Sequence, residues 1–194
     1  MNKYSQNNKL KILLTGSNGQ LGHDFQKLFN NLNIKYMSTD YQELNIVDSN
    51  ELENFFKNNN DFTHIINCVG YNDVDEAQNG DKTFLLNEKA PQKIAEFAKK
   101  MNAIFVTYST DFVFDGRKNI PYIEEDIPNP LSKYGISKHE GEKMVLDTWR
   151  KSFVIRTSWL FGIGGNNFNK QVLNWSKTHD KLNIVDDQVS APTC

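Results

Sequence analysis

Three polar residues of this chain have the types and the order that carbonyl reduction requires, namely Thr110, Tyr134 and Lys138. Hydride delivery to a carbonyl carbon needs a proton at the oxygen, and a tyrosine phenol can donate that proton. A phenol with its ordinary pKa of about 10 is a slow acid near neutral pH. A nearby ammonium group lowers that pKa by favouring the phenolate, and a threonine hydroxyl can polarise the same carbonyl. The three side chains together predict a site in which Tyr134 is the acid.

The spacing of these residues supports a shared site. Tyr134 and Lys138 stand four positions apart in the stretch KYGISKHEGE, so on a helix their side chains share one face. Thr110 follows the apolar run Ala103 to Tyr108, which places it at the carboxyl end of a predicted strand. Open α/β sheets bind ligands at that end of their strands. Because Tyr-x-x-x-Lys also arises by chance, the surrounding elements must confirm the site.

Short apolar runs of strand length alternate with amphipathic stretches of helix length. The predicted strands cover residues 11–15, 34–37, 64–69, 103–108, 153–156 and 182–185, and the predicted helices cover 20–32, 49–59, 81–101, 131–150 and 167–179. This alternation is typical of βαβ units with a parallel sheet buried on both faces. We therefore expect an α/β fold with a doubly wound parallel sheet of at least six strands.

Composition excludes several classes of protein. The 22 basic and 24 acidic residues give a net charge of −2 without long runs of one sign, so no nucleic-acid partner is expected. No apolar run reaches the ~20 residues that span a bilayer. The polar start has no signal-peptide core, which favours a cytoplasmic protein. Two cysteines (Cys68 and Cys194) and scattered histidines predict neither a disulfide framework nor a metal site.

A glycine-rich turn follows the first predicted strand, in the sequence TGSNGQLG. Gly16 and Gly19 would let backbone N–H groups approach a pyrophosphate at a helix N-terminus, and Gly22 would let that helix pack closely on the sheet. Asp40 comes 24 residues after Gly16, at the end of the second predicted strand, where a carboxylate can bind the adenosine ribose. We expect NADH or NADPH here, and Asp40 favours NADH because it repels a 2′-phosphate.

Longer motifs resemble one family. The chain resembles the extended short-chain dehydrogenase/reductases, and within them the dTDP-4-dehydrorhamnose reductases, from about Lys11 to the last residue. The matching motifs are LLTGSNGQLG, LNIVD, INCVGYNDVDEAQ, NEKAP, YSTDFVFDG, PYIEEDIPNPLSKYGISKHEGE, RTSWLFGIGGNNF and VDDQVSAPT. The resemblance implies an NAD(P)-binding Rossmann fold and reduction of the 4-keto group of dTDP-4-dehydro-6-deoxy-L-mannose to dTDP-L-rhamnose, for surface polysaccharide synthesis.

The resemblance also assigns roles to individual residues. It implies a catalytic triad of Thr110, Tyr134 and Lys138, a sugar site that includes Thr110, Asp111 and Trp159, and no metal. The implied cofactor-binding residues are Gly16, Gly19, Gln20, Leu21, Gly22, Asp40, Asn45, Ile46, Gly70, Tyr71, Asn72, Tyr108, Tyr134 and Lys138. Three residues depart from the family pattern, which usually has aspartate at Asn45, tyrosine at Phe112 and glycine at Ser190. None of them belongs to the triad.

The resemblance divides the chain into an N-terminal extension, residues 1–9, and a cofactor domain with part of the sugar pocket, residues 10–194. Family members continue beyond Ala191-Pro192-Thr193 with a last strand and most of a small substrate domain. We therefore expect that domain to be largely absent and the chain to be a fragment or poorly stable alone. Homodimer formation stays open.

Other functions remain to be weighed. A 4,6-dehydratase would need a second carboxylate after the catalytic threonine, but Asp111 is followed by Phe112. A nucleotide-sugar 4-epimerase keeps the same triad, although RTSWLFGIGGNNF and VDDQVSAPT favour a reductase. A non-catalytic NAD(P)-binding subunit that regulates a partner enzyme is the alternative from another class. A Tyr134→Phe change would abolish turnover in an enzyme and leave a regulatory role intact.

Overall fold

The computed structural model describes residues 10–79, 82–165 and 167–194. Its described residues form a sheet of five parallel strands in the order β2-β1-β3-β4-β5. The strands are β1 (Ile12–Thr15), β2 (Tyr36–Thr39), β3 (His64–Asn67), β4 (Ile104–Thr110) and β5 (Ser152–Thr157). The order reverses between β1 and β3, which is the switch point where such sheets bind ligands. The predicted doubly wound α/β fold is confirmed.

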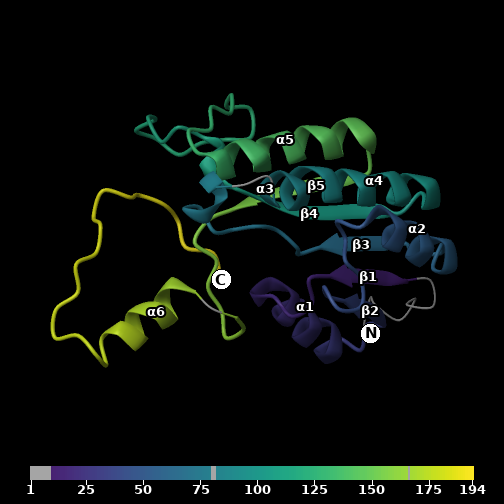
Figure 1. Cartoon of the computed structure of the whole chain (residues 1–194), viewed down its shortest axis with the longest axis horizontal. Coiled ribbons are helices and arrows are strands. Elements are labelled where there is room, and N and C mark those ends of the chain that lie inside the picture. Colours follow the sequence, from purple (N-terminus) through teal and green to yellow (C-terminus); the bar gives the residue numbers. More distant parts are fainter. Residues whose placement is uncertain (1–9, 80–81, 166) are drawn as a thin grey trace, which may run out of the picture.

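Helices cover both faces of this sheet (Figure 1). The longer helices are α1 (Gln20–Asn31), α2 (Ser49–Asn58), α4 (Ala90–Met101), α5 (Lys133–Thr148) and α6 (Phe168–Trp175). Short turns are η2 (Glu76–Asn79), α3 (Lys82–Phe84), η3 (Leu85–Lys89) and η4 (Asp111–Val113). In the figure α5 lies at the top with α4 just beneath it, α1 lies near β1 and β2 in the lower part, and α6 stands apart near the C-terminus.

Alternate strand residues fill two separate cores. Leu13, Ile65 and Phe105 point to the larger one, which α2, α4 and α5 cover. Leu14 and Ile66 point to the opposite face, where they pack against Phe29 of α1 and its neighbours. Successive side chains of a strand face opposite sides, so a strand buried on both sides is apolar at every position. The continuous run ILL in β1 is the sequence signature of this burial.

Side-chain caps fix where the helices begin. Asp48 accepts hydrogen bonds from the N–H groups of Asn50 and Glu51 at the start of α2. Ser132 accepts from Gly135 N at 3.0 Å and starts α5, which sets the helical phase of Tyr134 and Lys138. Such caps satisfy N–H groups that have no partner within the helix.

The prediction of a sixth strand at residues 182–185 was wrong. These residues have no regular structure, and Ile184 and Val185 are exposed. An apolar run becomes a strand only when it pairs with a sheet edge, and in the described structure this tail instead forms an isolated bridge between Leu160 and Thr193. The second strand also begins later than predicted. Ile34 N bonds back to Phe29 O to close the end of α1, so β2 starts at Tyr36.

The helix predicted at 81–101 is interrupted, and residue 81 lies outside the described part. Residues 82–84 are α-helical, η3 is a π-helical turn, and α4 completes the segment. Single π-turns inside helices commonly mark functional sites. The prediction missed it because its residues, LLNEK, are ordinary helix formers.

One part of the α1 face is uncovered at the edge of the sheet. Phe153 and Ile155 of β5 pair in register with Val106 and Tyr108, which belong to the α1 side. Phe153 is 58% exposed and Ile155 is 42% exposed. No helix among the described residues is long and apolar enough to cross a membrane.

Candidate active site

The glycine turn of residues 16–19 joins β1 to α1 at the carboxyl edge of the sheet. Gly16 has a positive φ of 73°, a conformation that favours glycine. A Cβ on Gly22 would lie 2.2 Å from Gly16 O, so only glycine lets α1 approach the turn this closely. The first turn of α1 has no acidic residue, and no side chain caps it. Its N–H groups and positive dipole end therefore suit a pyrophosphate, which fits a dinucleotide at Gly16, Gly19, Gln20 and Leu21.

Asp40 lies directly beside this turn, one residue after β2. Its Oδ2 accepts a hydrogen bond from Asn18 N at 2.8 Å, and its Oδ1 accepts from Tyr41 N at 2.8 Å. The carboxylate therefore holds the glycine turn against the end of β2. This placement agrees with a ribose contact and supplies a second, structural role that the sequence did not indicate.

Thr110 and Tyr134 meet at the carboxyl end of β4. Both are buried, with 5% and 8% of their surfaces exposed. Burial raises the pKa of Tyr134, the nearby Thr110 hydroxyl opposes that rise, and the negative charge of Asp111 adds to it. Thr110 Oγ1 also donates to Asp111 Oδ1 at 3.1 Å. The ring of Phe112 packs edge-on against Tyr134, with centroids 5.7 Å apart.

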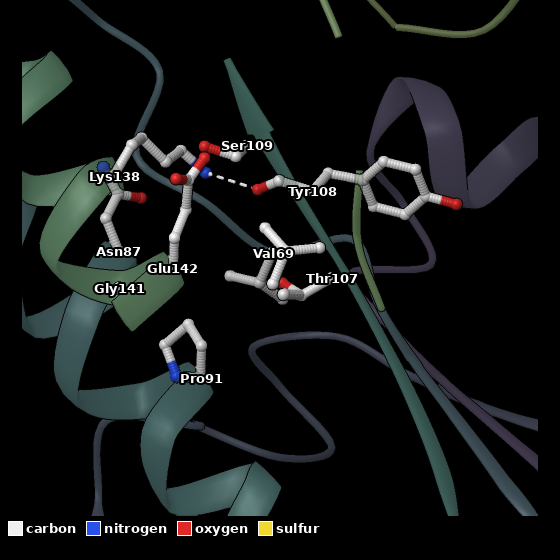
Figure 2. Close-up of a pocket in the computed structure, with 10 residues that line it drawn as sticks. Val69, Asn87, Pro91, Thr107, Tyr108, Ser109, Lys138, Gly141 and Glu142 are labelled. Atoms are coloured by element: carbon white, nitrogen blue, oxygen red, sulfur yellow. Dashed lines mark hydrogen bonds between the residues drawn. The ribbon is translucent and has the colours of Figure 1, made fainter. Parts of the chain in front are cut away.

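Lys138 lies one helical turn after Tyr134 and is directed into the sheet. Its Nζ donates to Tyr108 O at 3.2 Å (Figure 2). Burial lowers the pKa of Lys138 to about 8, and the charge of Glu142 opposes that shift. The expectation that Lys138 lowers the pKa of Tyr134 was wrong for this structure, because burial raises it and the opposing group is Thr110.

Gly70 makes room for the lysine ammonium. A Cβ at Gly70 would lie 2.7 Å from Lys138 Nζ and 3.4 Å from Asn87 Oδ1. The segment that follows β3 therefore passes directly over Lys138. Two predicted cofactor-binding residues, Gly70 and Tyr71, therefore lie in the segment beside Lys138 of the predicted triad.

Asn87 connects this segment to α5 and received no role from the sequence. It sits in the π-helical turn η3 and is 3% exposed. Its Oδ1 accepts from Tyr71 N at 2.8 Å, and its Nδ2 donates to Tyr71 O at 2.9 Å and to Ser137 Oγ at 3.0 Å. Ser137 Oγ donates to Tyr134 O at 2.7 Å. The NEKAP motif was the available signal, because it belongs to the family pattern.

Glu142 and Arg156 form a buried ion pair behind Lys138 and were also missed. Arg156 Nε donates to Glu142 Oε1 at 2.8 Å, and its Nη2 donates to Oε2 at 2.7 Å. Burial alone would raise the pKa of Glu142, but the hydrogen bonds from Arg156, the nearby Ser109 hydroxyl and the charge of Arg156 lower it overall. The i, i+4 spacing of Lys138 and Glu142 was the available signal.

The remaining predicted residues lie at different distances from this centre. Tyr108 extends toward α1, where its ring is 6.3 Å from that of Phe25. Asn45 Oδ1 accepts from Val47 N at 3.3 Å, and the Ile46 side chain is buried in the larger core. Asn72 is exposed. Trp159 has a positive φ of 46°, and its ring packs against that of Phe168 with the centroids 5.5 Å apart.

The last segments of the chain contact both halves of the candidate site. Asn167 caps α6 and donates to Gln20 Oε1 at 3.0 Å, which ties α6 to the glycine turn. Ser190 Oγ donates to Asp111 Oδ2 at 2.8 Å. In the described residues no group of three or more histidine, cysteine or acidic side chains is arranged to hold a metal ion.

The strand order, the glycine turn and the helix that follows it define an NAD(P)-binding Rossmann fold. The chain belongs to the family described as "RmlD substrate binding domain", whose model matches residues 10–194.

Three proteins similar to this chain are named dTDP-4-dehydrorhamnose reductase. The dTDP-4-dehydrorhamnose reductase of Aggregatibacter actinomycetemcomitans is 39% identical over 188 residues, which cover 94% of this chain and 63% of the relative. The crystal structure of the Clostridium acetobutylicum enzyme of that name has a TM-score of 0.90 and 41% identity, covering 95% and 65% of the two chains. That of the Bacillus anthracis enzyme, in complex with NADP, has a TM-score of 0.90 and 33% identity, covering 95% and 66%.

Not every relative is described as a reductase. The spore coat polysaccharide biosynthesis protein SpsK of Bacillus subtilis is 32% identical over 184 residues, covering 94% of this chain and 65% of its own length. The chain thus spans less than two thirds of the length of these curated relatives.

Proposed function

We propose that this chain is the cofactor-binding part of an oxidoreductase that reduces the 4-keto group of dTDP-4-dehydro-6-deoxy-L-mannose with NADPH or NADH, giving dTDP-L-rhamnose. The observation that carries the proposal is the placement of the buried Thr110 and Tyr134 side chains beside each other at the carboxyl edge of the sheet. The names of the relatives and the NADP complex of the Bacillus anthracis enzyme support the substrate and the cofactor.

The acid in this proposal is Tyr134. A nicotinamide cofactor held at the glycine turn by Gly16, Gly19 and Gln20 would supply the hydride for C4. Because burial raises the pKa of the phenol, Tyr134 is protonated at neutral pH, which is the form that can donate. Its proton passes to the former carbonyl oxygen, so ketone, hydride and proton together give the alcohol. Thr110 can donate a hydrogen bond to the same oxygen as negative charge develops on it.

The other residues hold this acid in place. Lys138 keeps a positive charge beside the segment at Gly70, which carries two of the proposed cofactor residues. Asn87 fixes both Tyr71 and, through Ser137, the backbone of Tyr134. Asp111 and Trp159 are proposed to contact the sugar. Formation of a homodimer and a cytoplasmic location stay predictions.

A Tyr134→Phe variant tests the proposal. It should be assayed by loss of NADPH absorbance, both in this chain and in a chimera in which residues 10–194 replace the matching part of the Clostridium relative. Removing the acid should reduce kcat by roughly 10²- to 10⁴-fold and change NADPH affinity far less. Tyr36→Phe, on β2 and bonded to Asn30, is the control and should keep full activity. Tight NADPH binding without turnover in the chimera would instead support the regulatory alternative.

A further inference from the structure

A second charged layer lies behind the candidate triad. A cavity of about 10 Å³ is lined by residues of β4, β5, η3 and α5, among them Lys138, Glu142 and Ser109. Figure 2 shows the Glu142 carboxylate, the Lys138 ammonium and the Ser109 hydroxyl directed toward one another. A space of this size holds about one water molecule, so it cannot admit a substrate group. The carboxylate of Glu142 therefore acts on its protein neighbours.

The position of this carboxylate is tightly defined. The Glu142 side chain is 5% exposed, whereas that of Arg156 is 28% exposed. The two charges make two parallel hydrogen bonds, a geometry that fixes orientation as well as distance. Ser109 Oγ is buried and has no hydrogen-bond partner of good geometry among the described residues, although it lies near enough to lower the pKa of Glu142.

We propose that Glu142 is a positioning residue for Lys138: its buried carboxylate faces the ammonium across the small cavity and keeps it directed at the Tyr108 carbonyl. The proposal rests on the proposed function for its catalytic meaning. The glutamate sits one helical turn behind the lysine, on the same face of α5. Since a buried ammonium loses its hydration, it needs a nearby negative charge to remain ionised.

The charged groups around Lys138 determine whether each of them raises or lowers its pKa. Burial lowers the pKa of Lys138 to about 8, and Glu142 raises it from what burial alone would give. The titratable and charged neighbours are Tyr134, His139 and Glu142 on α5, Arg156 on β5, Asp111 on η4, and Tyr108 on β4, whose phenol points toward α1 (Figure 2). Arg156 is the cation among them, so it repels Lys138 and offsets part of the attraction to Glu142.

This arrangement predicts opposite effects from the two members of the ion pair. Glu142→Gln keeps the shape and loses the negative charge, so the pKa of Lys138 should fall by about one unit, as expected when an adjacent opposite charge is lost. Arg156→Gln removes the repelling charge and should raise the pKa of Lys138. The double variant should lie between the two. Because it does not leave Arg156 without its ion-pair partner, it should also fold better than Glu142→Gln alone.

The experiment is an NMR titration of the Lys138 side chain, with ¹³C- and ¹⁵N-labelled lysine assigned by a Lys138→Arg variant. It requires no turnover, so failure of the proposed reaction would not affect its outcome. Glu140→Gln is the matched control, because Glu140 is a more exposed neighbour on α5 that pairs with Lys143. It should leave the pKa of Lys138 unchanged.

Opposite shifts in the two single variants support the proposal. If both lower stability and neither moves the pKa of Lys138, or if both move it in the same direction, the ion pair only tethers α5 to β5 and the proposal fails. If Glu142→Gln does not fold, the pKa of Lys138 still tests the proposal. It should rise in Arg156→Gln and take an intermediate value in the double variant. In an active chimera, the alkaline limb of kcat/KM should follow these shifts.

Discussion

Asn167 donates a hydrogen bond to Gln20 across 147 positions of sequence, with 3.0 Å between Nδ2 and Oε1. The same amide group donates to Gly162 O, and its oxygen accepts from Lys170 N as the cap of α6. One buried side chain thus joins the glycine turn of the cofactor site to the helix that follows Trp159. Neither predicted site contained this residue.

Changing Asn167 should separate its two roles. Asn167→Ala removes the cap and the link to Gln20, and loss of a cap costs about 0.5–2 kcal/mol. Asn167→Asp keeps the oxygen that caps α6 and loses the donor to Gln20. Hydrogen exchange at Lys170 and Gln171 should accelerate in the alanine variant and much less in the aspartate variant. Equal acceleration in both would show that the link to Gln20, rather than the cap, holds α6.

Thr110 should affect both the pKa of Tyr134 and the reaction rate. Its hydroxyl opposes the rise in the pKa of Tyr134, so Thr110→Val should move that pKa further upward. It should also reduce kcat by ~10²-fold, the scale for loss of one donor to a developing oxyanion. Thr110→Ser retains the hydroxyl and should retain most activity. The pH dependence of kcat/KM measures both effects. A valine variant with an unchanged profile would remove Thr110 from the proposed mechanism.

Asp40 should influence the choice between NADH and NADPH. Its carboxylate lies at the end of β2 beside Asn18, where a 2′-phosphate would meet its charge. Asp40→Asn removes that charge and keeps an oxygen for the bond from Asn18 N. The ratio of NADPH to NADH affinity should rise about tenfold, which corresponds to about 1.4 kcal/mol. Calorimetric titration with each cofactor gives the ratio, and Asp24→Asn on α1 is the control.

Stability should depend strongly on which face of the sheet a phenylalanine occupies. Phe105 is fully buried in the larger core, so Phe105→Ala should cost about 3–5 kcal/mol. Phe153 of β5 pairs in register with Val106 of β4 and is 58% exposed. Phe153→Ala should cost far less in this chain. Urea unfolding of both variants compares them, and similar losses would mean that the β5 face is covered in solution.

Acid should weaken the tie between α5 and β5. The folded pKa of Glu142 is lowered, since the bonds and charge of Arg156 outweigh burial. Its contribution to stability is therefore full above the unfolded carboxyl pKa of about 4.3 and is lost as pH falls through the lower folded value. Glu142→Gln should flatten the acid side of the stability profile, measured as the urea midpoint against pH. Glu140→Gln should not.

Much of the fold could be predicted from the sequence because its signals are local. The run ILL in β1 is apolar at every position, since both faces of this strand are buried. The glycine turn is visible because close contact at Gly22 tolerates no Cβ. The Tyr134 to Lys138 spacing is a property of one helix. These features need no knowledge of distant residues.

Tertiary contacts decided the rest. The apolar run at 182–185 has strand-like residues but no neighbouring strand, so it remains irregular. The pKa of Tyr134 depends on burial that no spacing reveals. Asn87, Glu142 and Asn167 were missed because their partners lie 14 to 147 residues away along the chain. The sequence by itself determined the strands, the cofactor turn and the candidate acid, whereas charge and polar contacts around that acid were set by the folded chain, since only folding brings distant groups together and removes water from them.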